Sequence, residues 1–155
     1  MTESTSTESA QASKRPEAAV GGVRRAGLVT LPPLVMLFLG LGVVQIFLAG
    51  LGVFSLDGEK VGSADETAFD AHRFLAMVMT AVALLIVLAA AAARPGRQIV
   101  ILSVVVLLLV SVVQSVLAAA GEDTALFGGL HAIFGIGTLG VASRLLTLSR
   151  PGGSR

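Results

Sequence analysis

Four long stretches of this chain contain no charged side chain. They cover residues 26–56, 74–93, 98–121 and 124–143. At ~1.5 Å of rise per residue, a helix of about 20 residues crosses a hydrocarbon core of about 30 Å. The apolar runs are continuous rather than alternating, which disfavours a β-barrel. The pattern therefore predicts four transmembrane helices, at about 31–54, 68–93, 98–120 and 125–147.

The composition agrees with lipid as the solvent of this chain. Hydrophobic residues make up 54% of the sequence and charged residues 14%, a balance that no ordinary soluble domain carries on its surface. The near-neutral net charge of +1 indicates no nucleic-acid partner. Because cysteine is absent, the chain has no disulfide framework, no thiolate metal site and no covalent haem attachment. We predict an all-α integral membrane protein whose first partner is the lipid bilayer.

The charged residues at the ends of these stretches predict how the helices are oriented. Nine of the eleven basic residues fall on one side of the predicted bundle: Lys14, Arg15, Arg24, Arg25, Arg94, Arg97, Arg144, Arg150 and Arg155. Short basic segments stay cytoplasmic, so a multi-pass plasma-membrane protein with both termini inside follows. Residues 1–27 have few large apolar side chains and predict a disordered cytoplasmic tail. Residues 28–148 then form the membrane domain, and residues 149–155 a cytoplasmic C-terminal tail.

Two segments of the chain resemble each other. Val43–Gly52 reads VVQIFLAGLG and Val112–Gly121 reads VVQSVLAAAG, with six of ten positions identical. Aligning Gln45 with Gln114 gives an offset of 69 residues, and aligning the two histidines gives 59. Both predicted pairs of helices also end in Arg-Pro-Gly. We therefore predict an internal duplication that forms a pseudo-twofold four-helix bundle of two plus two helices.

The duplicated positions place four polar side chains at one depth. Gln45, His72, Gln114 and His131 each lie roughly 10 Å inside the predicted outer helix ends. Since polar groups are costly against lipid, all four are expected to face the bundle interior. Three interpretations are open: a layer of hydrogen bonds that keeps the helices in register, a haem site, or part of a proton or ion path.

In the haem interpretation, His72 and His131 are the axial ligands of one b-type haem between the second and fourth helices. Four-helix bundles commonly build cofactor sites from inward side chains on facing helices. One turn deeper, Ala76 and Gly135 leave room for a flat macrocycle. Arg73 is a candidate partner for a haem propionate, and its alternative role is to reach the membrane interface.

The motifs QIFLAGLG, AHRF, VVQSVLAAAG and LHAIFG together resemble small four-helix actinomycete membrane proteins of unknown function. More distantly, the chain is similar to one four-helix half of haem A synthase, and this resemblance implies that His72 and His131 ligate haem. The chain departs from that enzyme in three ways: Phe69 stands where an acidic residue is expected, the paired cysteines are missing, and only one half-bundle is present. Haem modification by oxygenation is therefore disfavoured.

Two functions remain open at this stage. The first is a membrane protein that binds haem b for electron transfer. The alternative is a non-catalytic membrane packing or interaction module, with a membrane-protein partner or a second copy of the chain, in which the Gln/His layer is structural. No catalytic residue is predicted, because no phosphate-binding loop, dinucleotide fingerprint, HExxH motif or nucleophile elbow is present in the sequence.

Overall fold

A computed structural model describes residues 4–54 and 69–150, and for residues 4–19 it describes the backbone alone. The described chain is helical, without strands. Its elements are α1 (Ser4–Phe54), α2 (Asp70–Ala93), α3 (Arg97–Leu108), the π-helix η2 (Leu109–Val113), α4 (Gln114–Asp123) and α5 (Ala125–Ser149). The predicted C-terminal tail lies almost wholly outside the described residues, since residues 151–155 are not among them.

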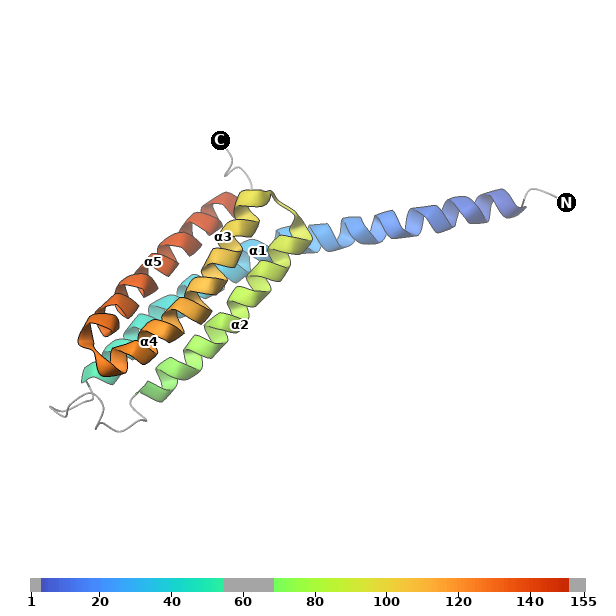
Figure 1. Ribbon diagram of the computed structural model, residues 1–155. Helices are drawn as coiled ribbons and strands as arrows, with labels where there is room; N and C mark the ends of the chain where they lie inside the picture. The colour runs from blue at the N-terminus through green and yellow to red at the C-terminus, as the bar shows by residue number, and fades with distance from the viewer. Residues whose placement is uncertain (1–3, 55–68, 151–155) are drawn as a thin grey trace.

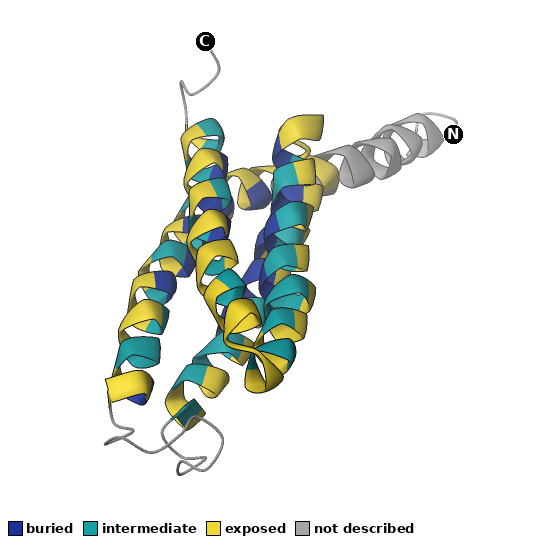
Figure 2. Cartoon of the chain, turned by 60° about the vertical axis from the view of Figure 1, so that its left-hand side comes forward, coloured by how far each residue is buried: buried dark blue, intermediate teal, exposed yellow. Residues whose placement is uncertain are grey.

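Four helical stretches in the described part are long and apolar enough to cross a membrane. They are Val20–Phe54, Asp70–Ala93, Arg97–Asp123 and Ala125–Ser149. The prediction of four apolar spans is confirmed. Exposed positions face outward along the helices (Figure 2). Many of them carry large apolar side chains, including Phe47 and Ile133, which are 62% and 64% exposed. Soluble proteins rarely expose an apolar surface of this extent, so the fold is that of a membrane protein.

The helices form a closed ring around the bundle axis (Figure 1). The order around the ring is α1, α2, the α3–η2–α4 span, and α5, which returns to α1. Within the described residues, α2 and α5 share no close backbone contact, and neither do α1 and α3. Consequently α2 and α5 lie diagonally opposite each other, and side chains that meet between them cross the centre of the bundle.

The tightly packed core fills only one half of the bundle. On α1 its members are Leu31, Val35 and Phe38, and on α2 they run from Met79 to Ala93. In the other half, α4 contains no buried residue and contacts α5 but neither α1 nor α2 within the described chain. At the end that holds the glutamines and histidines, α4 therefore stands away from the α1–α2 hairpin.

The first helix is longer than the composition predicts. It begins at Ser4, although residues 1–27 predict a disordered tail and a first span from residue 31. Once packing has nucleated a helix, adding a residue to its end costs little free energy. The tail is also rich in residues that favour helix, such as Ala, Glu, Lys and Arg. Pro32 and Pro33 consequently lie inside α1 rather than at its start, where they withhold N–H donors from the carbonyls of Leu28 and Val29. The axis of α1 changes direction as it enters the bundle (Figure 1).

The third span contains an irregularity that the sequence pattern does not reveal. The π-helix η2 interrupts it directly before Gln114. A π-turn accommodates one extra residue in a helix. The buried positions of the third span show where this residue enters. They correspond to buried positions of α1 at an offset of 68 rather than 69: Leu31 with Ile99, Val35 with Ser103, Phe38 with Val106 and Gly42 with Val110.

The second and fourth spans correspond without any such shift. Three buried positions of α2 match three of α5 at the offset of 59 that relates the histidines: Met79 with Thr138, Ala83 with Ala142 and Ile86 with Leu145. After η2, the offset between α1 and α4 becomes 69, which aligns Gln45 with Gln114. The π-turn therefore keeps both ends of the third span in phase with the same face of the bundle.

Candidate functional site

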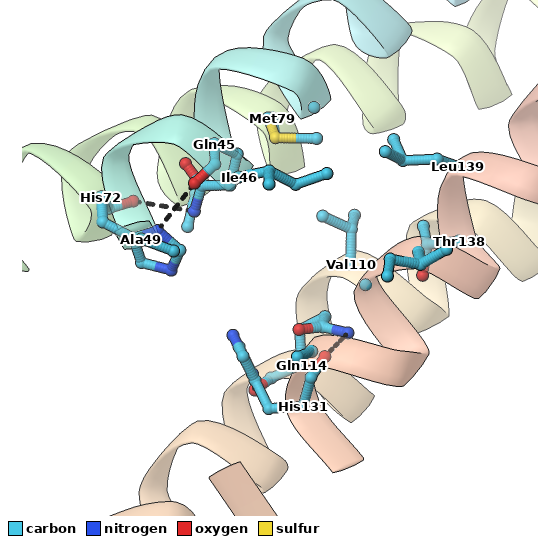
Figure 3. Close-up of a pocket in the computed structure, with 15 residues that line it drawn as sticks. Gln45, Ile46, Ala49, His72, Met79, Val110, Gln114, His131, Thr138 and Leu139 are labelled. Carbon is cyan, nitrogen blue, oxygen red and sulfur yellow. Dashed lines mark hydrogen bonds between the residues drawn. The ribbon is translucent and has the colours of Figure 1, made fainter. Parts of the chain in front are cut away.

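Gln45 on α1 and His72 on α2 bind each other reciprocally. The side-chain Nε2 of Gln45 donates to the backbone carbonyl oxygen of His72 at 3.0 Å. In return, the Nδ1 atom of His72 lies 3.2 Å from the backbone carbonyl oxygen of Gln45 (Figure 3). The two bonds join the C-terminal part of α1 to the N-terminal part of α2 and fix the orientation of the imidazole ring.

The second hairpin repeats this arrangement. The Nε2 atom of Gln114 on α4 donates to the carbonyl oxygen of His131 on α5 at 3.1 Å. The Nδ1 atom of His131 lies 3.1 Å from the carbonyl oxygen of Gln114. The same residue types therefore make the same pair of bonds in each hairpin, at distances that agree to about 0.1 Å.

These bonds determine which ring nitrogen is available to a ligand. A carbonyl oxygen can only accept, so Nδ1 of each histidine must carry the proton. In the neutral imidazole, Nε2 is then an unprotonated acceptor on both His72 and His131. A backbone carbonyl on Nδ1–H is also the usual support of a metal-binding histidine, because it holds the ring and raises its basicity. Both side chains are thus prepared to bind a Lewis acid through Nε2.

The two imidazoles face each other across the bundle. Their ring centroids are 6.2 Å apart and their planes are inclined by 55°. Both rings project into the space between the hairpins, as Figure 3 shows. When two imidazoles bind opposite sides of one metal ion, each ligating nitrogen lies about 2.1 Å from the metal. Their ring centroids are then roughly 6 Å apart. The separation therefore suits one shared metal centre with two axial nitrogens.

A cavity of about 210 Å³ adjoins both histidines and lies between the two hairpins. Small residues shape it on three of the four spans, namely Gly42 and Ala49 on α1, Ala76 on α2, and Ala132 and Gly135 on α5. Cofactor pockets usually measure about 300–1,000 Å³, so a tetrapyrrole would need the hairpins to move apart at this level. Although α4 makes no close contact with the first hairpin, Leu139 of α5 packs against Gly42 of α1 beside the cavity, so this movement has to separate the two residues.

One polar atom at this level has no partner. The Oε1 atom of Gln45 is buried and makes no hydrogen bond among the described residues. An unsatisfied buried acceptor costs about 1–3 kcal/mol. Turning the amide over would place this oxygen against the carbonyl of His72, so the bond to His72 fixes it in the unpaired orientation. The site therefore carries an energetic cost in the first hairpin that the second hairpin does not share.

Arg73 does not join the four polar side chains. It is not among the residues that line the cavity, and its guanidinium lies 3.9 Å from the carboxylate of Asp70 with more than half of the side chain exposed. Phe69 contacts the site instead, because its ring meets His72 edge-on with centroids 6.4 Å apart. The expectation that Ala76 and Gly135 line the site is met.

Met79 and Thr138 belong to the cavity wall, although the sequence analysis did not single them out. Each follows its histidine by seven residues, which is two helical turns on the same face. That periodicity is the signal that could have identified them. Val110 also lines the cavity, but η2 places it there, and no sequence spacing indicates a π-turn.

The described residues offer little to a proton path through the bundle. Among residues 20–54 and 69–150, whose side chains the structure describes, the carboxylates are Asp70, Glu122 and Asp123, all at helix ends on the histidine side. No cluster of three or more metal-ligating side chains occurs among them either. A metal ion held here would therefore receive two nitrogen ligands from this part of the chain.

Comparison with known proteins identifies one relationship. Residues 45–121 match the model of a family of unknown function, DUF6220. The match begins at Gln45, includes His72 and Gln114, and ends before His131. The similarity to an uncharacterised family is thus confirmed, whereas nothing found supports the resemblance to haem A synthase. No curated protein and no solved structure matches this chain significantly.

Proposed function

We propose that this membrane protein binds one b-type haem between α2 and α5, with His72 and His131 as the axial ligands. The observation that carries the proposal is the pair of imidazole rings with centroids 6.2 Å apart, each held through Nδ1 by the carbonyl oxygen of a glutamine, which leaves Nε2 of each ring free to bind a ligand. Bound haem would supply reversible one-electron transfer.

The chain's own residues would perform three tasks in this function. Gln45 and Gln114 hold the two rings in one tautomer and at one depth. The small residues on the cavity wall, such as Gly42 and Gly135, give a flat ligand access to the space between the hairpins. The apolar surroundings of Ile46 and Leu139 exclude water, which holds the site at low polarity.

The proposal includes an origin and an orientation for the bundle. Duplication of one helical hairpin is supported by the repeated Gln–His bonds and by the matched buried positions of the two halves. Orientation in the plasma membrane with both termini cytoplasmic is supported by arginines at one end of the bundle, among them Arg25, Arg94 and Arg144. In this orientation the histidines lie near the outer face.

One observation favours a second function. The cavity of about 210 Å³ is smaller than a tetrapyrrole requires, and each Gln–His pair closes its own hairpin without a ligand. The alternative is therefore a non-catalytic packing module in which the four side chains fix helix register, and which associates with a membrane-protein partner or with a second copy. Intramembrane hydrogen bonds of this kind contribute about 0.6–2 kcal/mol each.

An absorption spectrum distinguishes the two functions. The full chain should be produced with ample haem, purified in mild detergent and measured in its oxidised and reduced states. Haem binding predicts a Soret band and a reduced α band that disappear in His72→Ala and in His131→Ala. Met79→Leu, which changes another residue of the same cavity, is the matched control and should retain both bands.

Folding must be measured alongside the spectrum. Far-UV circular dichroism and gel filtration show whether each variant keeps its helices and remains monodisperse. Imidazole added to a folded His72→Gly variant should restore the bands if only the ligand is missing. A colourless wild-type protein with full helicity would overturn the haem proposal and favour the packing module.

A further inference from the structure

A second cavity lies between α1 and α2, at the end of the bundle away from the histidines. Its volume is about 610 Å³, and its lining is almost entirely apolar. Residues of both helices form its walls: Ala26, Thr30 and Leu34 of α1 with Leu85, Ala89 and Ala92 of α2. From Val23 to Leu37 the cavity follows α1 for about 21 Å, which exceeds half of a hydrocarbon core of about 30 Å.

Close contact between the helices forms the floor of this groove. Gly27 is buried, and a Cβ atom at this position would lie 2.6 Å from the backbone nitrogen of Ala93. The side chain of Arg24 also reaches across, and its Nε donates to the carbonyl oxygen of Ala93 at 3.3 Å. The groove is therefore a fixed feature of the α1–α2 contact and does not depend on the orientation of one long side chain.

Positive charge surrounds the end of the groove where α2 stops. Arg25 precedes the lining residue Ala26, and Arg94 follows the lining residue Ala92 by two positions. Both arginines are exposed, and neither side chain has a hydrogen-bond or ion-pair partner in the described part of the chain. Arg24 and Arg97 add to the charge at this end.

Among residues 20–54 and 69–150, whose side chains the structure describes, no carboxylate lies at this end of the bundle. Asp70, Glu122 and Asp123 all belong to the opposite ends of their helices. A membrane supplies two complementary groups at this depth, namely acyl chains and phosphate headgroups. Basic pockets between transmembrane helices recognise anionic lipid headgroups, and guanidinium groups match phosphate oxygens in geometry as well as charge.

We propose that the α1–α2 groove binds one anionic phospholipid, with an acyl chain along the groove and the phosphate at Arg25 and Arg94. An anionic headgroup keeps its net negative charge against the unpaired arginines, whereas a zwitterionic headgroup brings no net charge. The site therefore prefers anionic over zwitterionic lipid of the same chain length. This inference does not depend on haem binding.

Native mass spectrometry of the full chain tests the proposal. The detergent-solubilised protein is titrated with phosphatidylglycerol and, separately, with phosphatidylcholine of identical acyl chains. We expect phosphatidylglycerol to bind at least tenfold more tightly. The double variant Arg25→Gln/Arg94→Gln should bind the two lipids equally, while Arg144→Gln, which removes a charge on α5 outside the groove, should retain most of the preference.

A second set of variants tests the groove itself. Ala92→Leu places a larger side chain in the groove, and Ala91→Leu makes the same change at the exposed neighbouring position that does not line it. Ala92→Leu should weaken phosphatidylglycerol binding several-fold, and Ala91→Leu should not. Ala26→Leu, on the opposite wall, repeats the test if Ala92→Leu loses helicity. Equal binding of both lipids, an equal loss in Arg144→Gln, or no effect of groove filling would overturn the proposal.

Discussion

Gln45 and His72 each use their side chain to bind the backbone carbonyl oxygen of the other residue, at 3.0 and 3.2 Å. The pair therefore links the two helices through backbone carbonyl oxygens. Side-chain substitutions elsewhere in the site leave these acceptors in place. Because the histidine uses Nδ1 in this bond, its Nε2 remains available to whatever occupies the bundle centre. Gln114 and His131 repeat this pair of bonds between α4 and α5, so the same substitution can be compared in the two hairpins.

Replacing each glutamine by leucine should cost different amounts of stability. Gln114→Leu removes one interhelical bond and should lower the free energy of unfolding by about 0.6–2 kcal/mol. Gln45→Leu removes the same bond but also the buried, unpaired Oε1, so its loss should be smaller. Reversible unfolding in detergent measures both, and Gln98→Leu, at an exposed position, serves as the control. A larger loss in Gln45→Leu than in Gln114→Leu would contradict the asymmetry.

Removing one residue from η2 should be tolerated. The five residues of the π-turn contain one more than an α-helix needs there, so deleting Val112 should leave a regular helix with the buried faces on both sides in register. We expect a folded protein with little change in melting temperature. Circular dichroism during heating and gel filtration provide the measurement.

The matched control deletes Val43 from the identical Val-Val-Gln sequence in α1. No π-turn is present there, so the deletion rotates the two ends of α1 by about 100° relative to each other. It should abolish folding or lower the melting temperature strongly. Similar behaviour of the two deletions would show that η2 does not compensate an extra residue.

A methyl group at Gly27 should be destabilising, whereas one at Gly40 should not. The added Cβ at Gly27 would lie 2.7 Å from the carbonyl oxygen of Ala89, and backbone atoms cannot move aside as a side chain can. Gly27→Ala should therefore cost about 1–3 kcal/mol. At Gly40 no atom lies within 4 Å, so Gly40→Ala should be neutral or stabilise the helix by up to about 1 kcal/mol. Thermal unfolding of both variants in detergent is the measurement.

Single cysteines should report the orientation of the bundle, because the natural sequence contains none. Thr124→Cys and Gln98→Cys each place a thiol at an exposed position beside a helix end, on opposite sides of the predicted membrane. With cytoplasmic termini, a membrane-impermeant maleimide added to whole cells should label Thr124→Cys alone. Labelling of Gln98→Cys alone would reverse the orientation. Gly96 is unsuitable for the inner probe, since its φ of 129° disfavours any side chain.

Several parts of this protein could be predicted from the sequence because they depend on local properties. The continuous apolar stretches determine the four spans, since hydrocarbon leaves the backbone no partner outside its own helix. The depth of Gln45, His72, Gln114 and His131 follows from their distance to the charged helix ends and the fixed rise of a helix. The orientation is a prediction from these patterns, whereas the haem and lipid proposals also depend on how the helices pack.

Only the tertiary structure decided which groups pair and which remain free. The rotation of each helix about its axis places Gln45 against His72 within one hairpin, and the diagonal position of α2 and α5 brings the two imidazoles together. The length of α1 and the π-turn in the third span also emerge at this level, because helix extension and an extra residue are stabilised by packing rather than by side-chain preference. The sequence by itself determined the level of the polar side chains; the packing of the helices determined that the two imidazole rings meet between α2 and α5.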